Sequence, residues 1–168
     1  MGIYSRDEIE KILIRYGDTI YRMAFIQVKT HDAAEDVYQD VCMKLLRQKA
    51  RIEPEEHLKA WLIRTTINCC KDYWKSSWVK RISWKENSGQ EETVEVDNGE
   101  DIGYVTECVQ KLPEKYRIII HLYYYEDYSQ KEIANMLHMN ENTVASRLAR
   151  GRERLRKMME EEANVYEY

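Results

Sequence analysis

Hydrophobic side chains recur every three or four residues along most of this chain, a spacing that places them on one face of an α-helix. No stretch alternates strictly between apolar and polar residues, as a half-buried β-strand would, and no internal repeat is present. The pattern therefore predicts an all-α protein. In the first half it predicts four helices. Ser5 caps the first, which ends or kinks at Gly17-Asp18, and the second follows over 20–28. Asp32 caps the third, and the fourth runs from about 55 to 74 or beyond.

The third of these predicted helices separates an apolar face from a polar face most clearly. Its apolar stripe consists of side chains at helical spacing: Ala33, Ala34, Val37, Tyr38, Val41, Cys42, Leu45 and Leu46. Asp36, Gln39 and Asp40 fall outside the stripe, so we expect them to face water or a partner. On the sequence alone, solubility is the default explanation for exposed acids of this kind.

A pair of short helices is the strongest local signal, and it lies in the last third of the chain. Ser129 followed by Glu132 is a capping-box pattern that starts a helix, and the apolar run breaks near His138. Asn140 can cap a second helix, whose Val144 would pack back onto the first. Two short helices joined by a tight turn are typical of a helix-turn-helix, in which the second helix enters the major groove of DNA. His138 stands where glycine is common, and histidine tolerates a left-handed backbone better than most residues.

The charge of this segment also favours DNA binding. From residue 130 to residue 158 the chain carries seven Lys or Arg against three Glu. The alternative is a solvated basic face on a small bundle, because cations near the end of a helix also stabilise its dipole. The coincidence of cap, turn and basic helix favours the helix-turn-helix.

Acidic charge is concentrated in other parts of the chain. The formal net charge is −4, but residues 86–103 hold seven acids and no bases. The rest of the chain balances 26 Lys and Arg against 23 acids, a net charge of +3. Because the acidic segment is also poor in apolar residues, we predict a flexible linker over 86–102. It would join helical domains at 1–85 and 103–160, with an acidic tail at 161–168.

Several classes of protein and site are not indicated by the sequence. Charged residues between Arg6 and Lys11 interrupt any signal-peptide core, and no apolar stretch approaches the length of a membrane span. The four cysteines, two of them adjacent at Cys69-Cys70, and the four histidines show no metal-ligand spacing. No Gly-rich phosphate loop or nucleophile motif is present. We therefore expect reduced thiols, no metal, no cofactor and no catalytic centre in a cytoplasmic protein.

Aromatic and basic residues are interleaved at the end of the fourth predicted helix and beyond it. The residues concerned are Lys71, Tyr73, Trp74, Lys75, Lys80 and Arg81. Such a mixture suits single-stranded nucleic acid, because bases stack on the rings while phosphates meet the cations. A helix end that packs its Trp residues and solvates its Lys residues explains the same pattern equally well.

Three segments together resemble the extracytoplasmic-function (ECF) class of bacterial RNA polymerase sigma factors, in the same order and spacing. Residues 32–46 (DAAEDVYQDVCMKLL) are similar to the core-binding segment of that class, and residues 57–74 (HLKAWLIRTTINCCKDYW) are similar to its promoter-melting segment. Residues 112–155 are similar to its second domain. The resemblance covers nearly the whole chain, and it implies two helical domains without the extra domains of larger sigma factors.

The resemblance implies roles for residues of the first domain. Asp36, Gln39 and Asp40 would meet the clamp helices of the largest polymerase subunit. Asn68 would read a base flipped out of the non-template strand at the downstream (−10) element, since an amide can donate to and accept from a base edge. The alternative for Asn68 is an amide that forms hydrogen bonds inside the domain. The aromatic and basic residues named above would flank the opened strand.

The resemblance also implies that the second domain docks on the polymerase flap and reads the upstream (−35) element as duplex DNA. The predicted contact residues are Asn142 and Thr143, the groove-facing Ala145, Ser146, Ala149 and Arg150, and the phosphate- or flap-facing Arg147, Arg152 and Arg154. Two groove positions are alanine, which can touch only apolar groups such as a thymine methyl. The upstream consensus familiar in this class is therefore not expected to carry over unchanged.

We accordingly predict a bacterial promoter-specificity subunit of RNA polymerase and not an enzyme. Its partners would be core RNA polymerase, promoter DNA as duplex and as non-template single strand, and an anti-sigma factor able to hold it at a membrane. One alternative is a polymerase-independent helix-turn-helix repressor or activator, whose first domain serves dimerisation or sensing. A more distant alternative is a nucleic-acid enzyme with an appended binding domain. The aromatic-basic stretch and the loose linker argue against the first alternative, and the lack of a catalytic motif argues against the second.

Overall fold

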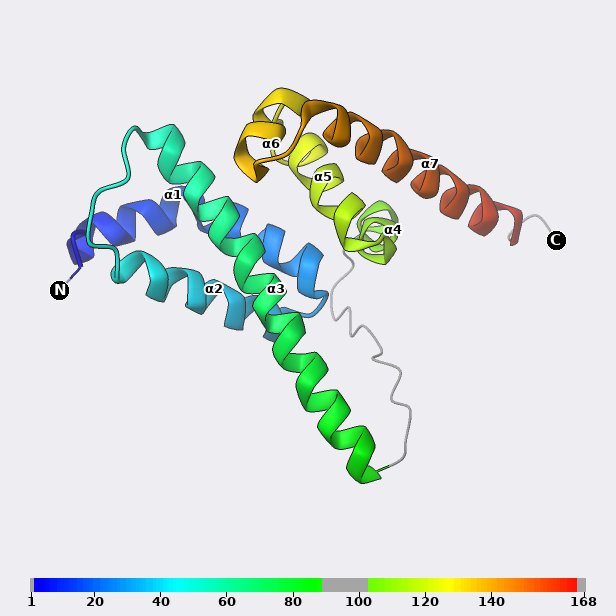
Figure 1. Ribbon diagram of the computed structural model, residues 1–168, viewed down its shortest axis with the longest axis horizontal. Helices are drawn as coiled ribbons and strands as arrows, with labels where there is room; N and C mark the ends of the chain where they lie inside the picture. The colour runs from blue at the N-terminus through cyan, green and yellow to red at the C-terminus, as the bar shows by residue number, and fades with distance from the viewer. Residues whose placement is uncertain (1, 89–102, 166–168) are drawn as a thin grey trace. The chain divides into compact units, whose positions relative to one another are not determined.

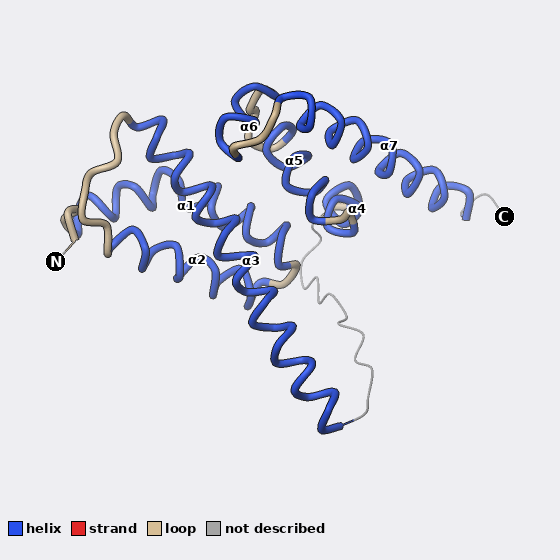
Figure 2. Tube along the Cα trace, in the orientation of Figure 1, coloured by secondary structure: helices blue, strands red, loops and turns tan. Residues whose placement is uncertain are grey.

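The computed structural model consists of helices and connecting loops over the residues it describes, which are 2–88 and 103–165, with the backbone alone for 78–88. The helices in these ranges are α1 (Arg6–Val28), α2 (His31–Leu46), α3 (Glu55–Ser88), α4 (Tyr104–Lys111), α5 (Glu114–Tyr124), α6 (Gln130–Leu137) and α7 (Glu141–Val165). No strand occurs in the described ranges (Figure 2). Helices α1–α3 form one unit and α4–α7 another, which confirms the prediction of an all-α fold with two helical domains.

In the first unit, the long α3 runs across α1 and α2 (Figure 1). The helix α1 begins as predicted, because Ser5 and Glu8 form a complete capping box with hydrogen bonds of 2.8 and 3.2 Å. Apolar faces of the three helices meet in a shared core that includes Ile20, Leu45 and Leu62, each at most 1% exposed. Burying one such side chain stabilises the fold by about 1.5–3 kcal/mol.

The predicted interruption at Gly17-Asp18 is wrong, because α1 continues through both residues. Gly17 is buried where α2 comes close, and a Cβ atom there would lie 3.0 Å from the hydroxyl oxygen of Tyr38. The glycine therefore allows two helices to approach each other and does not end one. The predicted cap of α2 is also wrong, since Thr30, not Asp32, accepts the hydrogen bond from the backbone N–H of Ala33.

Helix ends differ from the predicted domain boundaries at two places. The helix α3 continues past residue 85 to Ser88, and the rest of the predicted linker lies outside the described residues. The helix α7 continues into the predicted tail as far as Val165. Ion pairs account for this extension, because Glu160 pairs with Arg156 at 2.7 Å and Glu162 pairs with Lys111 of α4 at 3.4 Å.

In the second unit, α5 crosses α7 at closely packed positions. Gly151 of α7 is buried, and a Cβ atom there would lie 3.0 Å from Cγ1 of Ile120 and 3.4 Å from Cβ of Tyr116. The core beside this crossing includes Leu122 and Leu148, while Val105 of α4 is 50% exposed. The absence of a side chain at Gly151 thus sets the spacing between α5 and α7.

Other features of the described residues bear on what the units can bind. None of the described helices is long and apolar enough to cross a membrane. Within the same residues, no three His, Cys, Asp or Glu side chains are grouped so that they could hold a metal ion. The four cysteines are free thiols, three of them buried and Cys42 half-buried.

Candidate nucleic-acid and polymerase interfaces

The exposed face of α2 has an acidic part and an apolar part. Asp36, Gln39 and Asp40 are exposed, and neither aspartate forms an ion pair with another described residue. One and two turns further on, Met43 and Leu46 are 44% and 43% exposed. Leu46 was predicted to belong to the buried stripe, so that assignment is wrong. Met43 and Leu46 follow Asp40 at intervals of three residues, and this spacing could have predicted that all three side chains share the polar face.

Asn68 lies at the surface of α3, although its neighbours Ile67, Cys69 and Cys70 are buried. The sequence left open whether this amide forms hydrogen bonds inside the domain. Its exposure favours the other interpretation, because an exposed amide can meet an external partner without disturbing the core. Lys71 and Lys75 are exposed on the same helix.

The aromatic residues of α3 are anchored to the rest of the first unit. Tyr73 and Trp74 are half-buried, and their rings meet edge to face with centroids 5.8 Å apart. The indole N–H of Trp74 donates a 3.0 Å hydrogen bond to the backbone carbonyl of Gln27 in α1. Trp74 therefore serves the packing of α1 against α3 in addition to any role at the surface. The side chains of Lys80 and Arg81 lie outside the described residues.

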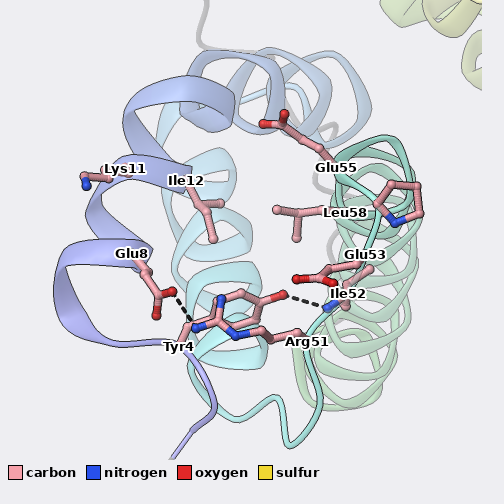
Figure 3. Close-up of a pocket in the computed structure, with 10 residues that line it drawn as sticks. Tyr4, Glu8, Lys11, Ile12, Arg51, Ile52, Glu53, Glu55 and Leu58 are labelled. Atoms are coloured by element: carbon pink, nitrogen blue, oxygen red, sulfur yellow. Dashed lines mark hydrogen bonds and ion pairs between the residues drawn. The ribbon is translucent and has the colours of Figure 1, made fainter.

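A cavity of about 710 Å³ lies between the start of α1 and the loop that precedes α3, and it contains none of the predicted site residues. Its floor is apolar, with Ile12 and Leu58, while Arg51 pairs with Glu8 and lies over the ring of Tyr4 (Figure 3). The backbone N–H of Ile52 donates to the Tyr4 hydroxyl at 2.9 Å. The loop has no helical periodicity, so this cavity could not be predicted from the local pattern.

The predicted helix-turn-helix is formed by α6 and α7. The hydroxyl of Ser129 caps α6 by accepting the backbone N–H of Glu132 at 3.1 Å. His138 ends α6 in the left-handed conformation with φ of 55°, as its position in the turn predicted. Asn140 then starts α7, since its side-chain oxygen accepts the N–H of Asn142 at 2.8 Å. Val144 is fully buried, which fixes α7 against the rest of the unit.

The outward face of α7 carries most of the predicted contact residues. Asn142, Ser146, Ala149 and Arg150 are exposed, while Thr143, Ala145 and Arg147 are half-buried. Arg152 and Arg154 are exposed but rest on aromatic rings of α5. The Arg152 guanidinium lies 5.5 Å from the ring centre of Tyr123, and that of Arg154 lies 5.1 Å from the ring centre of Tyr116. These contacts hold the two guanidinium groups against the rings of α5.

A second cavity, of about 370 Å³, lies between the start of α5 and the start of α7. It is lined by Lys115 and Tyr116 of α5 and by Asn142, Thr143, Ser146, Arg147 and Arg150 of α7. The structure thus brings five predicted residues together with two that sequence reasoning missed. Lys115 and Tyr116 lie outside the helix-turn-helix pattern, so only the tertiary crossing of α5 and α7 identifies them.

Two segments of the chain match known protein families. Residues 12–79 match the family described as Sigma-70 region 2, and residues 102–155 match the family described as Sigma-70, region 4. The RNA polymerase sigma factor SigV of Bacillus subtilis is 30% identical over 135 residues, covering 77% of this chain and 78% of SigV. The ECF RNA polymerase sigma factor SigM of the same organism is 28% identical over 159 residues, covering 88% of this chain and 93% of SigM.

Two solved structures share the fold. The sigma factor RpoE in complex with the anti-sigma factor NepR from Bartonella quintana has a TM-score of 0.68 at 24% identity, over 90% of this chain and 96% of that one. CnrH in complex with the cytosolic domain of CnrY has a TM-score of 0.67 at 20% identity, over 93% and 90% of the two chains.

Proposed function

Because this chain belongs to the extracytoplasmic-function class of RNA polymerase sigma factors, we propose that it directs core polymerase to specific promoters and helps to open the DNA there. In this role the polymerase carries out the chemistry of transcription. The main support is the match of two consecutive segments to sigma regions 2 and 4, together with an exposed cationic helix in the second. A polymerase-independent regulator is not favoured, because it would leave the region 2 match without a function.

In this proposal the exposed face of α2 binds core polymerase. Asp36 and Asp40 would pair with cations on the clamp helices of the largest subunit. Gln39, which lies between the two aspartates, would add hydrogen bonds to the same helices. Charge pairs at the rim of an interface chiefly steer association and set specificity, whereas buried apolar contacts slow dissociation. Met43 and Leu46 would supply such apolar contacts at the far end of the same face.

The two DNA elements would be bound by different helices. Asn68 of α3 would bond the edge of an extruded base at the −10 element, with Lys71, Tyr73, Trp74 and Lys75 beside the single strand. The helix α7 would enter the major groove at the −35 element, with Ser146 and Arg150 reaching polar base edges. Ala145 and Ala149 limit the contacts there to apolar groups such as thymine methyls.

An anti-sigma protein is the regulatory partner that we propose. Of the structural neighbours named above, RpoE was solved in complex with the anti-sigma factor NepR, and CnrH in complex with the cytosolic domain of CnrY. A partner of that kind would cover the polymerase-binding face until it is released. If the partner also has a membrane anchor, it would hold this chain at the membrane.

A transcription assay tests the central proposal. Core polymerase is incubated with genomic promoter fragments, with and without this protein, and specific initiation is expected only in its presence. The free protein should bind promoter duplex weakly and with strong salt dependence, since phosphate contacts dominate its affinity. Nanomolar, sequence-specific binding by the free protein at physiological salt, without stimulation of polymerase, would support the regulator and overturn the sigma-factor assignment.

A further inference from the structure

The cavity between α5 and α7 contains more positive charge than the fold of the second unit requires. Lys115 lies in the first turn of α5, where a cation opposes the partial positive charge of the helix N-terminus. Its contact with the ring of Tyr116, at 5.0 Å, offsets only part of this cost. Helix stability alone therefore does not explain a lysine at this position.

The cations at this cavity have no carboxylate partner in the described part of the chain. Lys115, Arg147 and Arg150 line the cavity, and none of them forms an ion pair with a described Asp or Glu. Further along the same helix the opposite is true, since Arg156 pairs with Glu153 at 2.6 Å and with Glu160 at 2.7 Å. The positive charge at the cavity is thus left for an external anion.

Tyr116 indicates a positive electrostatic potential at the cavity, and its ring positions Lys115 and the neighbouring Arg154. Burial raises the pKa of its hydroxyl, but the neighbouring Lys115, with Arg154 and Arg150, outweighs that effect and lowers the pKa below its ordinary value. The ring is 4% exposed, so the core holds it in place. Lys115 and Arg154 both lie against it, within about 5 Å of its centre.

We propose that this cavity is a clamp for a backbone phosphate of duplex DNA, with Lys115 and Arg150 as contact residues and Tyr116 as a positioning residue. Arginine binds phosphate oxygens in a forked geometry, lysine binds them as a point charge, and the hydroxyls of Thr143 and Ser146 can donate to the same oxygens. Asn142 and Thr143, in the first turn of α7, line the cavity, so the partial positive charge of that helix end lies beside it.

The position of the cavity favours DNA over a free phosphate ion. This step rests on the proposed function, in which α7 lies in the major groove. Ser146 and Arg150 belong both to the groove-facing set and to the lining of the cavity. The edge of a major groove is formed by the phosphates of the strands beside it. A strand that borders the groove would therefore pass the mouth of the cavity.

Salt-dependent binding of duplex DNA by the full chain tests the clamp. A labelled duplex is titrated at several low salt concentrations with the parent, with Lys115→Gln and with Lys115→Arg. Each lost phosphate contact reduces the slope of log K against log salt by about 0.9, so Lys115→Gln should bind roughly three- to tenfold more weakly near 0.1 M salt. The loss should be similar for duplexes of different sequence, because a phosphate contact carries no sequence information. Lys115→Arg should restore most of the slope.

Arg156→Gln is the matched control, since it removes the same charge from a paired arginine of α7. Its slope should change by less than half as much. Equal slopes for Lys115→Gln and the parent would overturn the proposal. A further series replaces chloride with inorganic phosphate at constant ionic strength. If phosphate displaces DNA from the parent much better than chloride does, and this advantage disappears in Lys115→Gln, the anion and DNA compete for the cavity, as the clamp requires. Inorganic phosphate that binds the parent but not Lys115→Gln, without displacing DNA, would make the cavity a site for free phosphate and overturn the clamp.

The transcription assay separates failure of the clamp from failure of the proposed function. A parent protein that stimulates initiation, together with an unchanged slope for Lys115→Gln, would remove only the clamp. A parent that does not stimulate initiation would remove the sigma-factor assignment, whatever its salt dependence. Lys115 is exposed, so circular dichroism of the variant should match that of the parent.

Discussion

The two surfaces that we assign to DNA differ in how their side chains are held. On α3 the aromatic residues are half-buried, and Trp74 is tied to the backbone of α1 by a hydrogen bond. On the second unit the side chains at the cavity come from two helices, three of them are cations, and Lys115 and Arg150 are exposed. The first surface is part of the fold of its unit, whereas the exposed cations of the second surface are not needed for the fold of theirs.

This difference predicts how far stability and DNA binding can be separated by mutation. A substitution among the α3 aromatics changes the core as well as the surface, so its effect on DNA is mixed with unfolding. A substitution among the exposed cations changes the electrostatic field and little else. The expected effects on the free energy of unfolding therefore decrease from Trp74 to the helix crossings and then to the exposed polar residues.

Trp74→Ala should have the largest effect on stability. It removes a half-buried ring and leaves the carbonyl of Gln27 without its indole partner, so we expect a loss of roughly 2–4 kcal/mol in the first unit. Trp74→Phe keeps a ring and loses the hydrogen bond, for a cost of about 1 kcal/mol. Hydrogen exchange on the full chain measures each unit separately.

Arg150→Gln is the comparison on the other surface and should change the stability of the second unit by no more than about 0.5 kcal/mol. The contrast between the surfaces fails if Trp74→Ala is as mild as Arg150→Gln, because Trp74 would then be a surface residue alone.

Gly151→Ala should have the next largest effect, because its new methyl group would meet core atoms of α5. The nearest are Cγ1 of Ile120 at 3.0 Å and Cδ1 at 3.2 Å, and Ile120 is 1% exposed. Overpacking of this kind costs about 1–3 kcal/mol, more than the roughly 1 kcal/mol that alanine gains over glycine in a helix. A wider crossing would also move Lys115 away from Arg150, so DNA binding should weaken together with stability.

Gly17→Ala is the matched change in the first unit. There the nearest atom is the hydroxyl of Tyr38 at 3.0 Å, at the far end of a half-buried side chain that can move. We expect its stability to stay within about 1 kcal/mol of the parent, or to rise slightly. Chemical denaturation of both variants checks this order, and a larger loss for Gly17→Ala would contradict it.

These glycines show why part of the fold could not be predicted from sequence. Helical periodicity identified the apolar runs that form α1, α2, α3, α6 and α7, and side-chain chemistry identified the caps Ser5, Ser129 and Asn140. A glycine inside an apolar pattern, however, can end a helix or admit a neighbouring one. Which of these occurs depends on the opposing side chain, here Tyr38, and local sequence does not contain that information.

The candidate sites were predictable to the extent that each lies on a single helix. Periodicity placed Asp36, Gln39 and Asp40 outside the apolar stripe of α2, and they are exposed. It failed for Leu46, because a leucine near the end of a helix can extend past the core that its spacing suggests. The cavity with Lys115 was not predictable, since two helices distant in the chain form it only when they cross at Gly151.

Charge reversal on α2 should leave stability nearly unchanged and affect polymerase binding. Asp36→Lys with Asp40→Lys alters exposed residues away from the core, so unfolding should shift by less than about 0.5 kcal/mol per site. If this face meets cations of the clamp helices, the reversal places like charges together and should weaken binding of core polymerase at least tenfold. A pull-down and a competition assay measure this.

Reversal of two exposed acids of α1, Glu10 and Asp18, changes the net charge equally and serves as the control. Equal retention of polymerase by both double variants would remove the core-binding role of α2. Weaker binding by both would indicate that only the total charge matters.

Asn68→Ala should have the smallest effect on stability and is the sharpest test of the α3 surface. Asn68 is exposed, so its loss leaves no buried partner unpaired, and alanine is the better helix former by up to about 0.7 kcal/mol. The variant should melt at or slightly above the parent temperature and should still bind core polymerase and the −35 element. Strand opening should fail, and the preference for one base of the −10 element should weaken, because the amide that bonds the extruded base is gone.

Potassium permanganate footprinting beside thermal melting measures both properties of this variant. Asn68→Asp is the informative companion, because it keeps the shape and an acceptor but replaces the amide donor with a negative charge. It should therefore change which base is preferred and not merely weaken the preference. Ser76→Ala, at another exposed position of α3, should open DNA normally if the effect belongs to Asn68 alone. Normal opening with unchanged base preference in Asn68→Ala would remove the base-reading role. The α3 surface would then bind the single strand only through its rings and cations, without reading a base at this position.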